Sequence, residues 1–100
     1  MPMTQIDLHP RAIFDARQAR RYYGRVSAAL AAQFVAELTA TVGRIAASPG
    51  TGSPHRHGTR MWRLHRFPYH VVYLEFGPDV LVLAVAHDRR RPTYWSRRLP

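Results

Sequence analysis

The side chains best suited to chemistry lie near the C-terminus, where an arginine cluster is followed by two aromatic residues. Arg89, Arg90 and Arg91 come directly before a Pro-Thr pair that leads to Tyr94 and Trp95. Guanidinium groups bind phosphates and carboxylates, and aromatic rings between cations can stack on nucleic-acid bases. This strip therefore predicts a surface that binds a negatively charged partner. Trp95 is expected to pack on the sheet edge instead, whereas stacking and packing are both open for Tyr94.

The overall charge also points to an acidic partner. Fifteen arginines, no lysine and six acidic residues give a net charge of +9 over 100 residues. Arginine without lysine is also what a GC-rich coding bias produces, so many of these side chains could simply be solvated. Their distribution is more informative, because no acid lies between Glu37 and Glu75 and five arginines lie in the last eleven residues before Leu99. The arginines between residues 44 and 66 and those of the C-terminal strip flank the predicted strands, so the two basic stretches could converge in space. The implied partner is nucleic acid, a ribosome or an acidic protein.

The histidines could carry further chemistry. Histidine side chains suit acid–base work near neutrality, which makes His70 a candidate, although a surface or packing role is commoner for a lone strand histidine. His55, His57 and His65 could suggest a metal site, but no cysteine or carboxylate lies nearby in the sequence and alternating His and Arg would repel a cation. The sequence has no glycine-rich phosphate loop and no Ser/His/Asp arrangement. We expect no metal and no cofactor.

Length and composition limit the class of protein. One hundred residues are enough for a single domain with one modest core. No apolar run approaches the roughly 18 residues that span a bilayer, and residues 1–10 have neither the positive start nor the apolar stretch of an export signal. The chain has no cysteine for disulfides. We expect one cytoplasmic domain over residues 1–100 that contacts no membrane.

The N-terminal half has the pattern of one strand and two helices. Residues 4–9 alternate apolar and polar side chains, which predicts a short strand that Pro10 ends. From Arg11 the apolar residues recur every three or four positions with arginines on the other side, and a second such stripe begins after Ser27. Ser27 is predicted to cap the second helix. Two helices joined so tightly should form an antiparallel hairpin.

The C-terminal half has the pattern of a sheet. Residues 49–54 hold two prolines and two glycines, which predicts a loop with neither helix nor strand. Strands are predicted at 59–66, 69–76 and 80–86 from their β-branched and aromatic content. One face of the first strand should lie on the hairpin and leave the other free for function, whereas the last strand is apolar on both sides and should be covered twice. The predicted fold class is α+β, with an N-terminal strand and an antiparallel helical hairpin packed on a small antiparallel sheet.

Several motifs occur along the chain in a recognisable order. The first predicted helix ends in the paired tyrosines at 22–23, and the second is followed by Ser-Pro-Gly at 48–50. Arg-Phe-Pro-Tyr at 66–69 opens a strand, and the last strand leads into LAVAHDRRRPTYW. Together, from about residue 4 to residue 98, these features resemble the RelE/ParE superfamily of bacterial toxins from type II toxin–antitoxin pairs.

This resemblance implies a small growth inhibitor with a dedicated partner. A cognate antitoxin would neutralise it by laying an extended or helical acidic segment across the sheet and helices. Two targets are implied by the two branches of the superfamily. The RelE branch cleaves messenger RNA on the ribosome, whereas the ParE branch inhibits DNA gyrase without a known catalytic act.

The RelE nuclease pattern fits this chain only in part. Cleavage by the RNA's own 2′-hydroxyl needs a proton acceptor, a proton donor and cations around the phosphate. Aligned without gaps from the Phe-Pro-Tyr motif, the pattern's basic positions fall on Met61, Arg63, His70 and Asp88, and its tyrosine falls on Tyr94. Met61 cannot take a proton, and Asp88 places negative charge beside the phosphate. Only Arg63, His70 and Tyr94 would be left as catalytic residues.

The ParE-like interpretation is therefore favoured. It predicts a toxin that acts by binding gyrase or another topoisomerase rather than as an enzyme, with a ribosome-dependent mRNA endoribonuclease as the alternative. A basic binding module that has lost toxicity is a third hypothesis. The residues predicted to bind the target or the antitoxin are Arg60, Arg63, His87, Arg89, Arg90, Arg91 and Tyr94.

Overall fold

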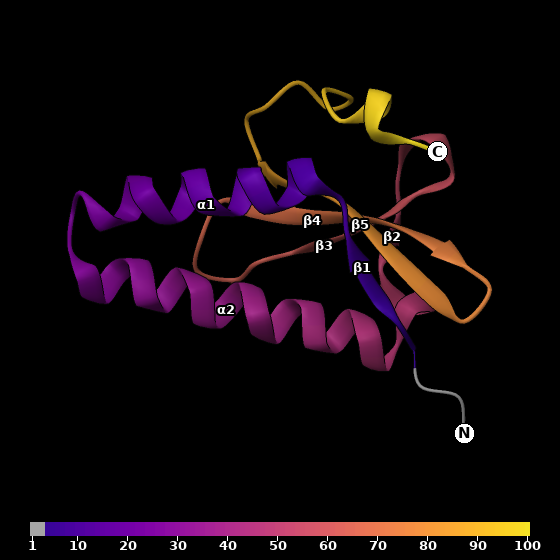
Figure 1. Ribbon diagram of the computed structural model, residues 1–100, viewed down its shortest axis with the longest axis horizontal. Coiled ribbons are helices and arrows are strands. Elements are labelled where there is room, and N and C mark those ends of the chain that lie inside the picture. The colour runs from indigo at the N-terminus through magenta and orange to yellow at the C-terminus, as the bar shows by residue number, and fades with distance from the viewer. Residues whose placement is uncertain (1–3) are drawn as a thin grey trace.

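A helical hairpin lies on one face of a five-stranded sheet in the computed structural model, which describes residues 4–100 (Figure 1). The helices are α1 (Pro10–Gly24) and α2 (Ala28–Ala47). In the order β1-β5-β4-β3-β2, the sheet contains β1 (Ile6–Leu8), β2 (Ser53–Pro54), β3 (Arg60–Arg63), β4 (Tyr69–Phe76) and β5 (Asp79–His87). The predicted α+β fold is confirmed. Residues 1–3, part of the stretch judged to carry no export signal, lie outside the described residues.

The two helices begin where the sequence pattern places them. At the start of α1, His9 accepts a hydrogen bond from the Arg11 amide at 3.0 Å, and Pro10 needs no donor in the first turn. At the start of α2, the Ser27 hydroxyl accepts a bond from the Leu30 amide at 3.0 Å, as predicted. Within residues 4–100, neither helix is both long and apolar enough to cross a membrane.

Apolar side chains cover both faces of the sheet. The larger cluster lies under the hairpin around Phe34, whose ring packs against those of Tyr23, Phe67 and Tyr69. The smaller cluster lies on the opposite face around Trp95, which is 0% exposed and packs on side chains of β4 and β5. Strand β5 contributes to both clusters, as predicted for a strand covered twice. The face expected to be free is thus partly covered by the C-terminal segment, residues 88–100.

The strand β1 pairs with β5 in parallel, whereas the other strand pairs are antiparallel. Ile6 lies opposite Val80 and Leu8 opposite Val82, and the His9 amide donates to the Val82 carbonyl at 2.9 Å. Beyond Val82, β5 has no strand neighbour on this side among residues 4–100. Its backbone groups there must find other partners, and side chains of α1 and the C-terminal segment supply them.

The prediction that residues 49–54 hold neither helix nor strand was wrong. They form a short 3-10 turn, Pro49–Thr51, and then β2, which pairs with β3. Proline is tolerated in β2 because this strand is at the edge of the sheet. The turn is held by Tyr73, whose hydroxyl donates to the Pro49 carbonyl at 2.6 Å and accepts from the Gly52 amide at 3.1 Å. A side chain at Gly52 would collide with that hydroxyl.

Candidate functional site

A buried ion pair attaches the C-terminal segment to α1. Arg98 Nη1 lies 2.6 Å from Asp15 Oδ2, and the two side chains are only 9% and 11% exposed. The same carboxylate oxygen accepts bonds from the Tyr94 hydroxyl and the Val85 amide, both at 3.2 Å, while Arg98 also donates to the Leu83 carbonyl at 3.0 Å. Asp15 and Arg98 therefore provide hydrogen-bond partners for backbone groups on the part of the β5 edge that β1 does not reach.

Tyr94 is part of this buried network. Burial, followed by the negative charge of Asp15, raises the pKa of Tyr94 to about 12 even though Arg98 and Arg90 act in the opposite direction. Its hydroxyl is therefore protonated at neutral pH and donates to Asp15. The Arg90 guanidinium lies over its ring, 4.0 Å from the centroid. This placement suits Tyr94 to hold the segment rather than to accept a proton.

On the face of the sheet away from the hairpin, Asp88 joins two of the sequence-predicted residues. Its Oδ1 lies 2.8 Å from His70 Nδ1, and its Oδ2 lies 3.4 Å from Arg63 Nη1. Arg63 and His70 are also directly paired across β3 and β4. The His70 side chain is 13% exposed and that of Arg63 is 66% exposed. The three residues of the nuclease alternative thus belong to two networks, because the Tyr94 hydroxyl binds Asp15 instead.

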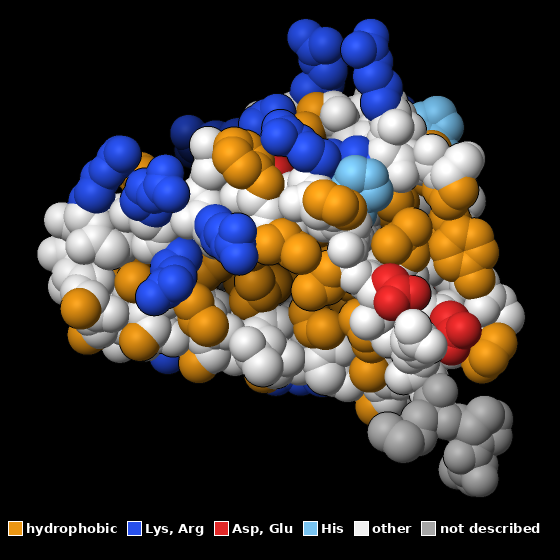
Figure 2. All heavy atoms as spheres, in the orientation of Figure 1, with side chains coloured by type: hydrophobic (Ala, Val, Ile, Leu, Met, Phe, Trp, Pro, Cys, Tyr) orange, Lys and Arg blue, Asp and Glu red, His pale blue; other side chains and the backbone are white. Residues whose placement is uncertain are grey.

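Some of the remaining predicted binding residues are held by other groups of the protein, and others are exposed. Arg60 is engaged, because its Nε lies 2.7 Å from Glu75 and its Nη1 donates to the Gly52 carbonyl at 2.9 Å. His87 accepts a bond through Nδ1 from the Arg89 amide at 3.1 Å. Exposed arginines at 89, 90 and 91 extend the basic surface beyond β5. Figure 2 shows arginine side chains gathered over α1 and above it, away from the acidic side chains near the β4–β5 turn.

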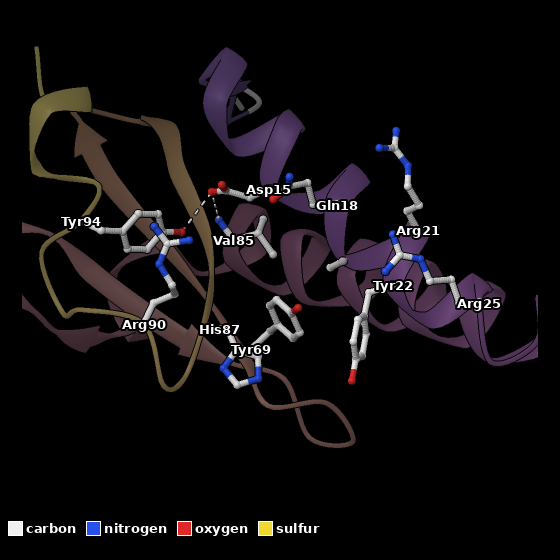
Figure 3. Close-up of a pocket in the computed structure, with 11 residues that line it drawn as sticks. Asp15, Gln18, Arg21, Tyr22, Arg25, Tyr69, Val85, His87, Arg90 and Tyr94 are labelled. Atoms are coloured by element: carbon white, nitrogen blue, oxygen red, sulfur yellow. Dashed lines mark hydrogen bonds between the residues drawn. The ribbon is translucent and has the colours of Figure 1, made fainter.

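A cleft between α1 and the C-terminal segment brings arginines of α1 to the C-terminal strip (Figure 3). The cleft has a volume of about 330 Å³. It is lined by Arg90 and Tyr94 of the predicted strip, by His87 at the end of β5, and by Arg21 and Arg25 of α1. The strip thus meets the end of α1 at this cleft, while Arg63 of the basic stretch between residues 44 and 66 reaches the neighbouring Asp88.

Sequence reasoning missed the residues that organise these groups. Asp15 is the sole acid of α1 and lies among arginines, which was a usable signal. Its pairing with Arg98 spans 83 positions and depends on the topology. Asp88 was judged only as a misfit to a nuclease pattern, yet it orients His70. Arg21 and Arg25 looked like an ordinary solvated helix face.

Two histidines of the candidate metal set pack against Trp95 instead. The ring centroids of His55 and His57 lie 5.7 and 6.1 Å from that of Trp95, and His55 is 6.0 Å from His70. Within residues 4–100, buried nitrogens without a hydrogen-bond partner include His55 Nε2 and Trp95 Nε1. Burial lowers the pKa of His55, and the nearby His70, Arg56 and Arg63 lower it further.

This environment of His55 predicts a loss of stability in acid. The unfolded chain takes up a proton near pH 6.5, whereas folded His55 takes it up only at lower pH. The contribution to stability is therefore full above pH 6.5 and is lost as the pH falls through the lower pKa, with a slope of at most about 1.4 kcal/mol per pH unit. We expect His55→Gln to flatten the decline in unfolding free energy between pH 7.5 and 5, measured by urea denaturation. The exposed His65→Gln is the control, and equal slopes for both variants would contradict the assignment.

A second, more apolar groove lies between the helices. It is lined by small side chains of α2 and by the last turns of α1, and its residues are Arg17, Arg20, Arg21, Gly24, Arg25, Ala28, Ala31, Ala32, Val35 and Ala36. In Figure 2 a strip of hydrophobic side chains is visible between the two helices, with arginines above it. The groove thus combines an apolar floor with a cationic rim.

An antiparallel hairpin on a five-stranded sheet, with a basic C-terminal segment folded over the far face, is the RelE/ParE-like α+β fold. The family can be stated more closely. A match to the family described as the ParE toxin of type II toxin–antitoxin systems, parDE, extends over residues 6–92. The chain belongs to the ParE toxin family.

A solved structure agrees with this fold. The chain is similar to a chain of the chromosomal ParDE toxin–antitoxin system from P. aeruginosa, with a TM-score of 0.75 and 20% sequence identity. The similarity covers 85% of this chain and 96% of that chain. No match was found among curated proteins.

Proposed function

We propose that this ParE-family toxin arrests growth by binding DNA gyrase or a related topoisomerase in the cytoplasm. The observation that carries the proposal is the division of roles in the C-terminal segment. Tyr94 and Arg98 are locked into the Asp15 network, whereas the arginines at 89, 90 and 91 are exposed. A binding surface needs exposed charge, and a nuclease needs Tyr94 beside the other catalytic groups.

A cognate antitoxin would neutralise the toxin at the groove between α1 and α2. The apolar floor fits the hydrophobic face of an amphipathic helix, and the rim of Arg17, Arg20 and Arg25 fits acidic residues at its margins. The resulting charge complementarity would speed association of the two proteins. The solved ParDE system to which this fold is similar supports a partner of this kind.

The endoribonuclease is the second candidate, and one observation favours it. The Asp88 carboxylate holds His70 through Nδ1, which is how a general base is commonly oriented. Arg63 lies next to this pair and is well exposed, so it could contact a phosphate. In this mechanism the unbound nitrogen of His70 would accept the proton of the attacking 2′-hydroxyl.

Charge removal separates the two candidates. We expect the triple variant Arg89→Gln, Arg90→Gln and Arg91→Gln to weaken gyrase binding by at least about tenfold, because electrostatic attraction to the target is lost. Growth arrest on induction should weaken accordingly. Purified variants can be compared by surface plasmon resonance against gyrase, and the cells by their growth curves.

The control removes the same number of charges elsewhere. Arg11, Arg44 and Arg56 are exposed on other parts of the surface, and replacing them with Gln should leave binding and growth arrest nearly unchanged. His70→Gln should likewise retain toxicity if the toxin is not a nuclease. Full toxicity of the triple 89–91 variant, together with loss of toxicity in His70→Gln, would contradict the proposed function and favour the nuclease.

A further inference from the structure

The cleft between α1 and the C-terminal segment carries an unbalanced positive charge. Arg21, Arg25 and Arg90 line it, and within residues 4–100 none of their guanidinium groups is paired with a carboxylate. The one acid in the lining, Asp15, is already neutralised by Arg98. The cleft is therefore electrostatically suited to an anion, and planar guanidinium forks suit phosphate in particular.

Aromatic rings complete the walls of the same cleft. Tyr22 lies between the two arginines of α1 in sequence and is 59% exposed, although a large ring is usually more buried. Tyr69 and His87 lie opposite with their ring centroids 5.0 Å apart. Figure 3 shows the lining side chains of α1 on one side of the cleft and Arg90 and Tyr94 of the C-terminal segment on the other, with Tyr69 and His87 between them. Exposed rings among cations are suited to stacking on a base.

We propose that this cleft binds a nucleoside phosphate, with the phosphate on Arg21 and Arg25 and the base against Tyr22. The amide of Gln18, which also lines the cleft, can hydrogen-bond the base edge. The volume of about 330 Å³ lies at the lower end of the range for small-molecule sites, so it suits one nucleotide and not a helix. An acidic peptide would match the charge but has no base to stack on the aromatic walls.

The test is binding of adenosine 5′-monophosphate to the purified full chain, measured by isothermal titration calorimetry at low salt. Arg21→Gln/Arg25→Gln should weaken binding by about a hundredfold, because two charge-assisted contacts are lost. Tyr22→Ala should weaken it by about tenfold while Tyr22→Phe keeps the affinity, because stacking needs only the ring. Arg11→Gln/Arg44→Gln removes equal charge outside the cleft and should bind like the parent. All four positions replaced in these arginine variants are exposed, and thermal unfolding checks that each variant is folded.

A second ligand distinguishes free nucleotides from the end of a nucleic-acid chain. Equal affinity for a 5′-phosphorylated tetranucleotide would assign the cleft to the end of a nucleic-acid chain, and binding of the mononucleotide alone would assign it to free nucleotides. The inference is overturned if inorganic phosphate or a hexaglutamate peptide binds as tightly, if the cleft variants match the control, or if no nucleotide binds. These outcomes do not depend on the proposed function, because gyrase binding and growth arrest are measured separately.

Discussion

Replacing Asp15 with Asn is expected to destabilise the fold by about 3–5 kcal/mol. The substitution leaves Arg98, which is only 9% exposed, without its counter-charge. It also weakens the acceptor that Tyr94 and the Val85 amide share. Desolvation of an unpaired cation is the dominant cost. Urea denaturation of the purified chain measures the loss as a fall in the unfolding free energy.

A double variant shows whether the buried charge is the cause. Arg98→Met in the Asp15→Asn background removes the unpaired cation and keeps most of the side-chain volume, so it should recover a large part of the lost stability. Asp7→Asn is a matched control, because Asp7 is an exposed acid near the same end of the chain. A loss below about 1 kcal/mol for Asp15→Asn would show that the pair contributes no more than an exposed ion pair, and it would contradict the role of Asp15 as the counter-charge of a buried arginine.

Replacing Trp95 with Ala is expected to cost about 3–5 kcal/mol. Trp95 is fully buried and is the largest side chain of the cluster on the far face of the sheet. Its removal leaves a cavity against β4 and β5 and frees the C-terminal segment from the sheet. Thermal and urea unfolding measure the effect, and Trp95→Phe should cost less because it keeps an aromatic ring in the cluster.

The Trp95→Ala variant also tests the proposed role of the basic surface at residues 89–91. The arginines at 89, 90 and 91 belong to the segment that Trp95 holds, so Trp95→Ala should reduce both stability and toxicity. Undiminished stability with lost toxicity would instead mean that Trp95 contacts the target directly, which its burial argues against.

Local signals in the sequence account for much of the fold. The strand at 69–76 and the Ser27 cap were predicted as observed, because β-branched content and capping chemistry act within a few residues. Trp95 was predicted to pack on the sheet edge; it is buried, but it lies on the far face of the sheet against β4 and β5. The strand β2 was missed because composition alone indicated a loop and because the Tyr73 bonds that hold the preceding turn come from a residue far along the chain.

The candidate site was less predictable for the same physical reason. The basic strip at 89–91 was visible from composition alone. Its meeting with Arg21 and Arg25 depends on how α1 lies beside β5, and the Asp15–Arg98 pair depends on where β1 ends. Single-residue chemistry suggested roles for Tyr94 and Asp88, but their actual roles follow from the partners that the fold brings to them.

The central claim is that this toxin inhibits a topoisomerase by binding and does not cleave RNA. The most direct test is to induce it in a bacterial host and, within minutes, compare cleavage of translated messenger RNA with the supercoiling of a reporter plasmid. The account predicts intact message together with lost supercoiling or broken DNA. Cleaved message with normal supercoiling would contradict it.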